Sequence, residues 1–405
     1  MRGLRSFIVT PRLPFPPRSG ADLRCWYTVE ALRRLGPVGV FGIGSQRPTS
    51  PPTTGISVWT STSLESALDH VGKSGPASWM QIPDWRPSDW YFTPEIADEV
   101  AAAAEASDPS LVVLDSLTVA GYREVAGRSP TKVVLNAHNV ESDLQRQLAE
   151  SETSAPAKMV RRRFAERTRF LEEELLGRVD RVWACSQADQ RVVTETFPTS
   201  PPIDVLPNVI DAGVYNEAYE VHLGRRPRTV TKLVFPAQFA YLPNLRAAGY
   251  LMEEVLPALR VSRPEIELCL VGHSPSEWMR RAAAADPGLE VTGLVDDVRP
   301  YLTRADAMVL PLFEGSGTRL KALEAMAAGL PMIATAKAVE GLDVEPGRHV
   351  LIAERLEDFI GAIRQLDHPE TYGRLVREGR NLVERSYSPG SLERAVRRSV
   401  DAIFG

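Results

Sequence analysis

The chain has 405 residues, a length that favours two hydrophobic cores over one. Hydrophobic residues make up 43% and charged residues 24% of the sequence, which is typical of a globular protein and excludes a disordered or fibrous chain. The net charge of −5 argues against a nucleic-acid-binding protein, because that function requires a basic surface.

The first half of the chain alternates short apolar runs with stretches of helical periodicity. Residues 6–10 predict a buried strand, the Pro/Gly-rich residues after them predict a loop through Gly20, and residues 21–35 predict an amphipathic helix. Further apolar runs predict strands at residues 38–42, 111–114, 133–135, 181–184 and 204–206. This alternation favours a parallel, doubly wound sheet.

A polar, arginine-rich stretch at residues 220–231 interrupts the pattern, and we place the interdomain linker there. Beyond it we expect strands at residues 233–236, 267–271, 289–292, 307–310 and 332–334, and helices at 244–259 and 391–404. The second half is therefore also α/β. We expect domains at residues 1–218 and 219–388, and a C-terminal helix at 389–405 for which a return to the first domain is one option.

The cysteines and the hydropathy of the chain narrow the protein class further. Cys25, Cys185 and Cys269 are far apart and odd in number, so they indicate core residues rather than a disulfide framework or a zinc site. No stretch approaches the ~20 apolar residues of a membrane helix, and no export signal is recognisable, so we expect a cytoplasmic protein. Peripheral membrane contact stays open. The three arginines at 161–163 are either a basic patch or a solvated helix face balanced by Glu166 and by Glu172 to Glu174.

An aromatic-rich region departs from the regular alternation. Residues 79–92 contain Trp79, Trp85, Trp90, Tyr91 and Phe92. One interpretation is that these rings close a long insertion onto its own domain, because exposed aromatic clusters are uncommon without a partner. The other is that a flat or apolar ligand docks on them.

The most informative segment is residues 314–331, which read EGSGTRLKALEAMAAGLP. A buried strand is predicted at 307–313 and a helix at 320–328, so Gly315 and Gly317 lie in the turn between them. Unpaired amides and the helix dipole favour an anion at such a turn, and Arg319 and Lys321 add positive charge. Alternatively, Lys321 and Glu324, one turn apart, form a surface ion pair worth about 0.2–0.5 kcal/mol.

With these elements in this order, the sequence resembles the family 4 glycosyltransferases of the two-domain GT-B fold along most of its length. The resemblance rests on short motifs at residues 14–20, 138–142, 184–189, 206–211, 243–244, 271–272, 293–298 and 317–324. Their serial order and the last motif are the specific part.

The resemblance implies two doubly wound Rossmann-like domains that face a central cleft. It implies that the C-terminal domain holds a nucleoside-diphosphate sugar, such as a UDP-sugar, and that a hydroxyl acceptor enters from the N-terminal side. A hexose-type sugar is then transferred with retention of the anomeric configuration. We expect no metal ion, no cofactor besides the nucleotide-sugar co-substrate and no nucleic-acid partner. A role in cell-wall or glycoconjugate biosynthesis is compatible with this, and the acceptor stays open.

The family pattern also implies roles for individual residues. Glu324 is assigned to the ribose, because one carboxylate can accept hydrogen bonds from two adjacent hydroxyls. Arg319 and Lys321 are assigned to the charge that develops on the leaving diphosphate, and His138, just after the predicted strand at 133–135, to the donor sugar. The other donor-binding candidates are Gly20, Glu314, Ser316, Gly317, Thr318 and Arg246, and the acceptor-binding candidates are Asp22, Trp85 and Trp90.

Two departures from the family pattern concern the donor. Many relatives carry a glutamate eight positions before Glu324, where this chain has Ser316, and Glu314 comes two residues too early. Either Ser316 and nearby amides replace that glutamate, or Glu314 reaches in from a reshaped turn. A basic pair often found after the first strand of the nucleotide domain is also missing. Arg246 is the candidate substitute, with helix-end solvation as its other interpretation.

Other functions stay open at this point. A sugar-nucleotide epimerase or a phosphorylase of the same fold is the enzymatic alternative. The non-enzymatic alternative is a nucleotide-sugar-binding partner subunit without turnover, which the replacement of the family glutamate by Ser316 keeps open.

Overall fold

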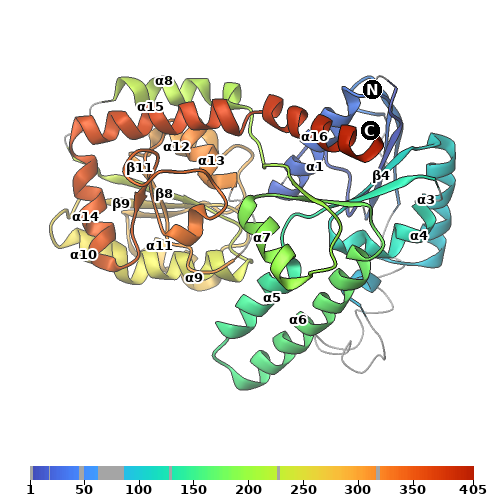
Figure 1. The fold of residues 1–405 in the computed structure, drawn as a ribbon. Helices are drawn as coiled ribbons and strands as arrows, with labels where there is room; N and C mark the ends of the chain where they lie inside the picture. The colour runs from blue at the N-terminus through green and yellow to red at the C-terminus, as the bar shows by residue number, and fades with distance from the viewer. Residues whose placement is uncertain are drawn as a thin grey trace. The chain divides into compact units, whose positions relative to one another are not determined.

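The computed structural model describes residues 3–17, 19–44, 50–62, 86–126, 130–225, 229–315 and 320–405. The chain forms two compact units, one of Met1–Asn208 with Pro389–Gly405 and one of Val209–Ser388. Each unit is built on one parallel β-sheet with helices packed against it (Figure 1). The predicted pair of doubly wound α/β domains is confirmed.

The sheet of the first unit has the strand order β3-β2-β1-β4-β5-β6-β7, and its strand pairs are parallel. The strands are β1 (Ser6–Thr10), β2 (Val38–Ile43), β3 (Ile56–Thr62), β4 (Leu111–Asp115), β5 (Lys132–Asn136), β6 (Arg181–Ala184) and β7 (Ile203–Val205). The order reverses between β1 and β4. Doubly wound sheets bind their ligands beyond the carboxyl ends of the strands at such a reversal.

The helices of the first unit connect these strands. They are α1 (Gly20–Arg33), α3 (Pro94–Ser107), α4 (Arg123–Ala126), α5 (Glu141–Glu150), α6 (Ala155–Leu176), α7 (Gln187–Thr196) and α16 (Pro389–Phe404), with 3-10 turns at Pro87–Trp90 and Leu117–Tyr122. The C-terminal helix α16 belongs to this unit, where it packs against α1. The fully buried Trp183 of β6 donates a hydrogen bond from Nε1 to Ser399 Oγ of α16 at 2.7 Å.

The sheet of the second unit has the order β10-β9-β8-β11-β12-β13 and reverses between β8 and β11. Its strands are β8 (Lys232–Pro236), β9 (Glu267–Val271), β10 (Leu289–Val291), β11 (Ala307–Leu310), β12 (Met332–Ala334) and β13 (Leu351–Ile352). Its helices are α8 (Asn216–Gly224), α9 (Leu242–Tyr250), α10 (Leu256–Arg260), α11 (Glu277–Ala285), α12 (Arg299–Arg304), α13 (Leu320–Ala327), α14 (Leu356–Leu366) and α15 (Pro369–Ser386). Helices α9, α10 and α11 lie on one side of the sheet, and α12 and α13 lie on the other (Figure 1).

The helix predicted at residues 244–259 is interrupted. A π-helical segment, Leu251–Val255, separates α9 from α10. Pro257 lies at the start of α10, and because proline has no backbone N–H it cannot make the regular helical hydrogen bond to the preceding turn. In the π-helical segment each backbone hydrogen bond spans five residues instead of four, so the chain does not continue as a uniform α-helix.

The predicted linker at residues 220–231 is wrong. Residues 220–224 are the second half of α8, whose His222 is fully buried and is hydrogen-bonded through Nδ1 to Tyr372 of α15 and through Nε2 to the Leu302 carbonyl of α12, each at 3.0 Å. Arg225 pairs with Asp306 at 3.0 Å. The division between the units consequently falls at Asn208 and Val209, ten residues before the expected boundary at 218.

Two surface expectations can be compared with the structure. Of the three consecutive arginines, Arg162 and Arg163 are exposed on α6 and Arg161 pairs with Glu152 at 3.2 Å. Glu172, expected to balance them at the surface, is buried instead. Within the described residues, no helix combines the length and apolarity that a membrane span requires.

Candidate active site

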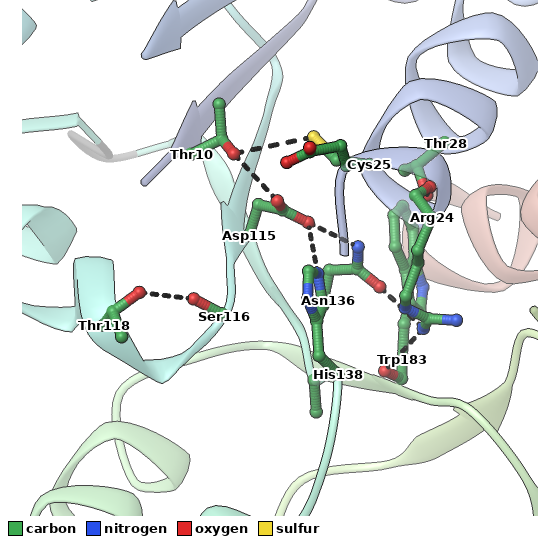
Figure 2. A network of polar contacts seen from close by, with 12 residues as sticks. Thr10, Arg24, Cys25, Thr28, Asp115, Ser116, Thr118, Asn136, His138 and Trp183 are labelled. Atoms are coloured by element: carbon green, nitrogen blue, oxygen red, sulfur yellow. Dashed lines mark hydrogen bonds and ion pairs between the residues drawn. The ribbon is translucent and has the colours of Figure 1, made fainter. Parts of the chain in front are cut away.

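A polar network lies at the carboxyl end of the first unit's sheet (Figure 2). The sheet register pairs Asp115 with Asn136 and Asn136 with Trp183, and Thr10 follows the residue pair Val9 and Leu114. These four residues therefore lie at one level of four adjacent strands, β1, β4, β5 and β6. Asp115 and Asn136 are not among the site residues predicted from the sequence, although each directly follows a predicted strand.

Asp115 is the centre of this network. Its Oδ1 lies 2.9 Å from His138 Nε2 and accepts a hydrogen bond from Asn136 Nδ2 at 2.8 Å, and its Oδ2 accepts one from the Thr10 hydroxyl at 2.9 Å. The side chain is only 3% exposed. Burial alone would raise the pKa of Asp115, but the charge of His138 and the hydrogen bonds outweigh it and hold that pKa below its usual value. Asp115 is therefore ionised at neutral pH.

Arg24 of α1 completes the network from the other side. Its Nη2 donates to Asn136 Oδ1 at 2.7 Å, and its Nη1 donates to Asn208 Oδ1 and to the Leu206 carbonyl, each at 2.9 Å. Arg24 is 4% exposed. Asn136 thus joins a buried cation to a buried anion and hydrogen-bonds to both, while Arg24 Nε has no hydrogen-bond partner among the described residues.

His138 lies where the sequence predicted it, just beyond β5, with 13% of its side chain exposed. It lines a pocket together with residues of β5, α6 and α7; the pocket also includes Ala137, Asn139, Val140, Glu141 and Glu172. The contact between Asp115 Oδ1 and Nε2 fixes the position of the imidazole ring. The rest of the ring is available to a ligand in the pocket.

Glu172 of α6 caps the helix that follows His138. Its two carboxylate oxygens accept hydrogen bonds from the backbone N–H groups of Glu141 at 2.7 Å and Ser142 at 3.2 Å, at the start of α5. Burial raises the pKa of Glu172 to about 7, and the nearby Glu141 charge adds to the shift, while the hydrogen bonds with Ser142 oppose it. Protonation of this group is therefore sensitive to pH near neutrality.

This raised pKa gives a pH dependence of stability. Unfolded Glu172 loses its proton near its ordinary pKa of 4.5, whereas folded Glu172 keeps it up to about 7, so the group makes the free energy of unfolding fall between these pH values. Glu172→Gln should remove that part of the slope in urea denaturation measured from pH 4.5 to 8. Glu173→Gln, at an exposed neighbouring position on α6, is the matched control. Equal slopes for wild type and Glu172→Gln would contradict the assignment.

Two donor and acceptor candidates lie at the start of α1. Ser19 caps this helix by accepting from the Asp22 backbone N–H at 3.2 Å, and Gly20 is the first helical residue rather than part of the loop. Asp22 is 4% exposed and forms a two-bond ion pair with Arg12, at 2.6 and 2.8 Å. The carboxylate of Asp22 therefore holds the β1–α1 loop onto the helix. Its predicted acceptor contact stays a prediction.

The aromatic region is described only in part. Trp79 and Trp85 lie outside the described residues. The Trp90 ring stacks on Phe164 of α6, with centroids 5.8 Å apart, and Phe92 packs on Tyr122 at 5.2 Å. These contacts agree with closure of the region onto its own unit, and an acceptor role of Trp90 stays a prediction.

In the second unit, Glu324 lies on α13. The Tyr215 hydroxyl donates to its Oε1 at 3.2 Å. Burial raises the pKa of Glu324, while the Tyr215 hydrogen bond and the Lys321 charge oppose the shift. Because the Tyr215 hydroxyl donates to Glu324 and the residue is only partly exposed, Glu324 does not fit the alternative of a surface ion pair.

Lys321 is held one turn earlier on the same helix. Its ammonium group donates to Asn244 Oδ1 at 3.0 Å and lies 4.8 Å from the ring centroid of Phe235, at the end of β8. Asn244 is 8% exposed, and its Nδ2 donates to the Gln238 carbonyl at 2.9 Å. Asn244 thus ties Lys321 to the loop that follows β8.

Arg246 and Glu314 meet in the same unit. Arg246 of α9 donates from Nη1 to both carboxylate oxygens of Glu314, at 2.8 and 2.9 Å, and the Glu314 side chain is 13% exposed. The two residues that the sequence offered as separate substitutes for missing family residues therefore form one ion pair. The remaining donor candidates, Ser316, Gly317, Thr318 and Arg319, lie outside the described residues.

Two further expectations concern metals and cysteines. In the described part of the chain, no three His, Cys, Asp or Glu side chains gather as a metal-ligand set. Cys25 and Cys185 are buried and Cys269 is partly buried, and none of these three described residues is in a disulfide.

Two family models match the chain. The model described as Glycosyltransferase Family 4 matches residues 19–214, and the model described as Glycosyl transferases group 1 matches residues 231–368. No curated protein matches the chain in sequence.

Several solved structures are similar over almost the whole chain. Sucrose-phosphate synthase from Thermosynechococcus elongatus has 18% identity and a TM-score of 0.72, with 99% of each chain covered. HepE from Anabaena, in complex with UDP and glucose, has 13% identity and a TM-score of 0.68, with 98% of this chain and 100% of that chain covered. A glycosyltransferase from Rickettsia africae has 12% identity and a TM-score of 0.61, with 99% of each chain covered. At these identities the likeness establishes the fold, which is GT-B.

Proposed function

Because the chain belongs to the glycosyltransferases of the GT-B fold, with a family 4 domain followed by a group 1 domain, we propose that it uses a nucleoside-diphosphate sugar. In this proposal a hexose-type sugar passes to a hydroxyl acceptor with retention of the anomeric configuration and without a metal ion. The proposal is supported most directly by the arrangement on α13, where a cation and a carboxylate stand one turn apart and each is held by its own neutral partner.

The two α13 side chains match the two ends of a nucleoside diphosphate. The Glu324 carboxylate is a hydrogen-bond acceptor for the two ribose hydroxyls, and Tyr215 fixes its orientation. The Lys321 ammonium stabilises the negative charge that develops on the diphosphate as the glycosidic bond breaks. In a retaining, front-face reaction the departing phosphate oxygen takes the acceptor proton, so no separate general base is needed.

The choice of donor rests on analogy. The similar HepE was solved with UDP and glucose and with UDP-glucose. UDP-hexoses are therefore the first donors to test, and the acceptor is left to a panel of hydroxyl compounds.

Glu324→Ala is expected to weaken nucleoside-diphosphate binding about 10- to 100-fold, which corresponds to about 1.5–3 kcal/mol for hydrogen bonds to a charged group. Calorimetric titration of wild type and variant with UDP, GDP, TDP and ADP measures this. The 2′,3′-dideoxy analogue of the preferred nucleotide is the matched control, because it lacks the hydroxyls and should bind both proteins equally. Unchanged affinity for the natural nucleotide in Glu324→Ala would remove the ribose assignment.

The reaction itself is tested with the preferred donor and the acceptor panel, with and without EDTA. Retained product configuration, read by NMR of the new anomeric centre, and full activity in EDTA are expected. An inverted product would contradict the front-face route. Donor conversion without any acceptor would identify an epimerase, dependence on inorganic phosphate a phosphorylase, and nucleotide binding without turnover a non-catalytic subunit.

A further inference from the structure

Arg24 determines which atoms donate and which accept along the hydrogen-bond network of Figure 2. The guanidinium of Arg24 can only donate, so the Asn136 atom that faces it at 2.7 Å is the carbonyl oxygen Oδ1. The amide nitrogen Nδ2 of Asn136 then points the other way and donates to Asp115 Oδ1. Arg24 therefore removes the ambiguity in how the Asn136 amide is placed.

Asp115 in turn determines which ring nitrogen of His138 carries the proton. An ionised carboxylate has no proton to donate, and Asp115 accepts from Asn136 and from Thr10. The His138 ring atom 2.9 Å from Asp115, Nε2, must therefore carry the proton. The proposal concerns the uncharged form of the ring, in which one nitrogen donates and the other accepts, so that Nδ1 offers a lone pair.

We propose that His138 binds its ligand group as a hydrogen-bond acceptor through Nδ1, so that this group is a hydroxyl that donates, and that Asp115 and Asn136 are the positioning residues that impose this tautomer. The proposal rests on the proposed function for the identity of the hydroxyl, which belongs to the sugar nucleotide or its acceptor. The tautomer itself depends only on the network. Neither Asp115 nor Asn136 touches the ligand in this proposal.

The tautomer is tested without any substrate. In the ¹⁵N NMR spectrum of the wild-type protein at pH 8, His138 should show Nε2 protonated and Nδ1 unprotonated. Asp115→Leu should remove this preference, because leucine offers no acceptor to Nε2, and both tautomers should then be populated. Protonation at Nδ1 in the wild-type protein would overturn the proposal whether or not the protein transfers sugar.

The ligand group is tested by kinetics of the wild-type protein with deoxy and deoxyfluoro analogues of the donor sugar and of the acceptor. Fluorine accepts a hydrogen bond but cannot donate one. At one hydroxyl, both the deoxy and the fluoro analogue should lower kcat/KM about tenfold, and both penalties should vanish in His138→Ala. If the fluoro analogue is as active as the natural substrate at the position that depends on His138, the hydroxyl there accepts a hydrogen bond. That result would contradict the proposal.

The positioning role is tested with Asp115→Leu and a matched control. This variant should lower kcat/KM about 10²-fold and lose the dependence on the His138-linked hydroxyl. Thr28→Val is the control, because Thr28 donates to the Arg24 carbonyl at 2.9 Å inside the same network but does not contact Asp115. Its kcat/KM and its tautomer should match wild type. If Asp115→Leu transfers sugar as well as wild type, the positioning role is wrong while the transferase proposal stands, whereas absence of transfer in wild type counts against the transferase alone.

Discussion

Lys321→Met is expected to lower kcat about 10²- to 10³-fold while it weakens nucleoside-diphosphate binding much less. In the proposed reaction the ammonium group faces the diphosphate, whose negative charge increases as the sugar leaves, so it would stabilise the transition state more than the ground state. Asn244 and Phe235 hold that group in place before substrate binds, and a preorganised charge has no reorganisation cost during the reaction. Methionine keeps the length of the side chain and removes the charge.

The measurement is single-turnover transfer together with calorimetric nucleotide binding. Lys337→Met is the matched control, since Lys337 lies in the same unit on a different element, the 3-10 turn Ala336–Val339, and pairs with Glu340 at 2.5 Å. Asn244→Leu should reproduce part of the Lys321→Met loss but add little to it in the double variant, because both changes act through one ammonium group. A kcat of Lys321→Met within threefold of wild type would mean that the ammonium does not stabilise the leaving group.

Most strands could be predicted because they are central and fully buried. The apolar runs of β1, β2, β4 and β11 stand out in the sequence since both faces of a doubly wound sheet are covered. Strand β3 was missed because it is an edge strand with a partly exposed, alternating pattern, and β13 was missed because it has two residues. The hydropathy pattern of an edge strand is therefore harder to recognise than that of a central strand.

The linker error has a different cause. The composition of residues 220–231 is polar and arginine-rich, which resembles a linker, yet His222 and Arg225 are satisfied by partners about 80 residues away or more. A polar segment that is neutralised inside a fold cannot be told from an exposed one by composition. Only the tertiary partners distinguish the two cases.

The sequence suggested the charged candidates of the site, but it did not suggest the residues that hydrogen-bond to them and fix their positions. Lys321 and Glu324 follow from the turn and the helix, and His138 follows from the strand end. Asp115, Asn136, Tyr215 and Asn244 could not be selected, because their importance depends on which strands are neighbours. Asp115 and Asn136 are 21 residues apart in sequence and become direct partners only through the pairing of β4 with β5.

Arg24→Met is expected to lower the free energy of unfolding by about 3–5 kcal/mol, because it leaves several buried acceptors without a donor, each at a cost of about 1–3 kcal/mol. The variant would remove the donor of Asn136, Asn208 and the Leu206 carbonyl, while Asp115 keeps its contact with His138. Methionine fills a similar volume, so the loss reports charge and hydrogen bonding rather than a cavity. Urea denaturation at pH 7 measures the change.

Arg33→Met is the matched control on the same helix. Arg33 pairs with Glu30 one turn earlier, in a partly exposed i,i+3 pair that is worth about 0.5 kcal/mol or less. A loss no larger in Arg24→Met than in Arg33→Met would show that the network does not depend on the guanidinium. The double variant Arg24→Met/Asp115→Leu should be less destabilised than the two single variants together, because removing both charges leaves no uncompensated ion in the core. Additive losses would mean that Asn136 does not couple Arg24 to Asp115.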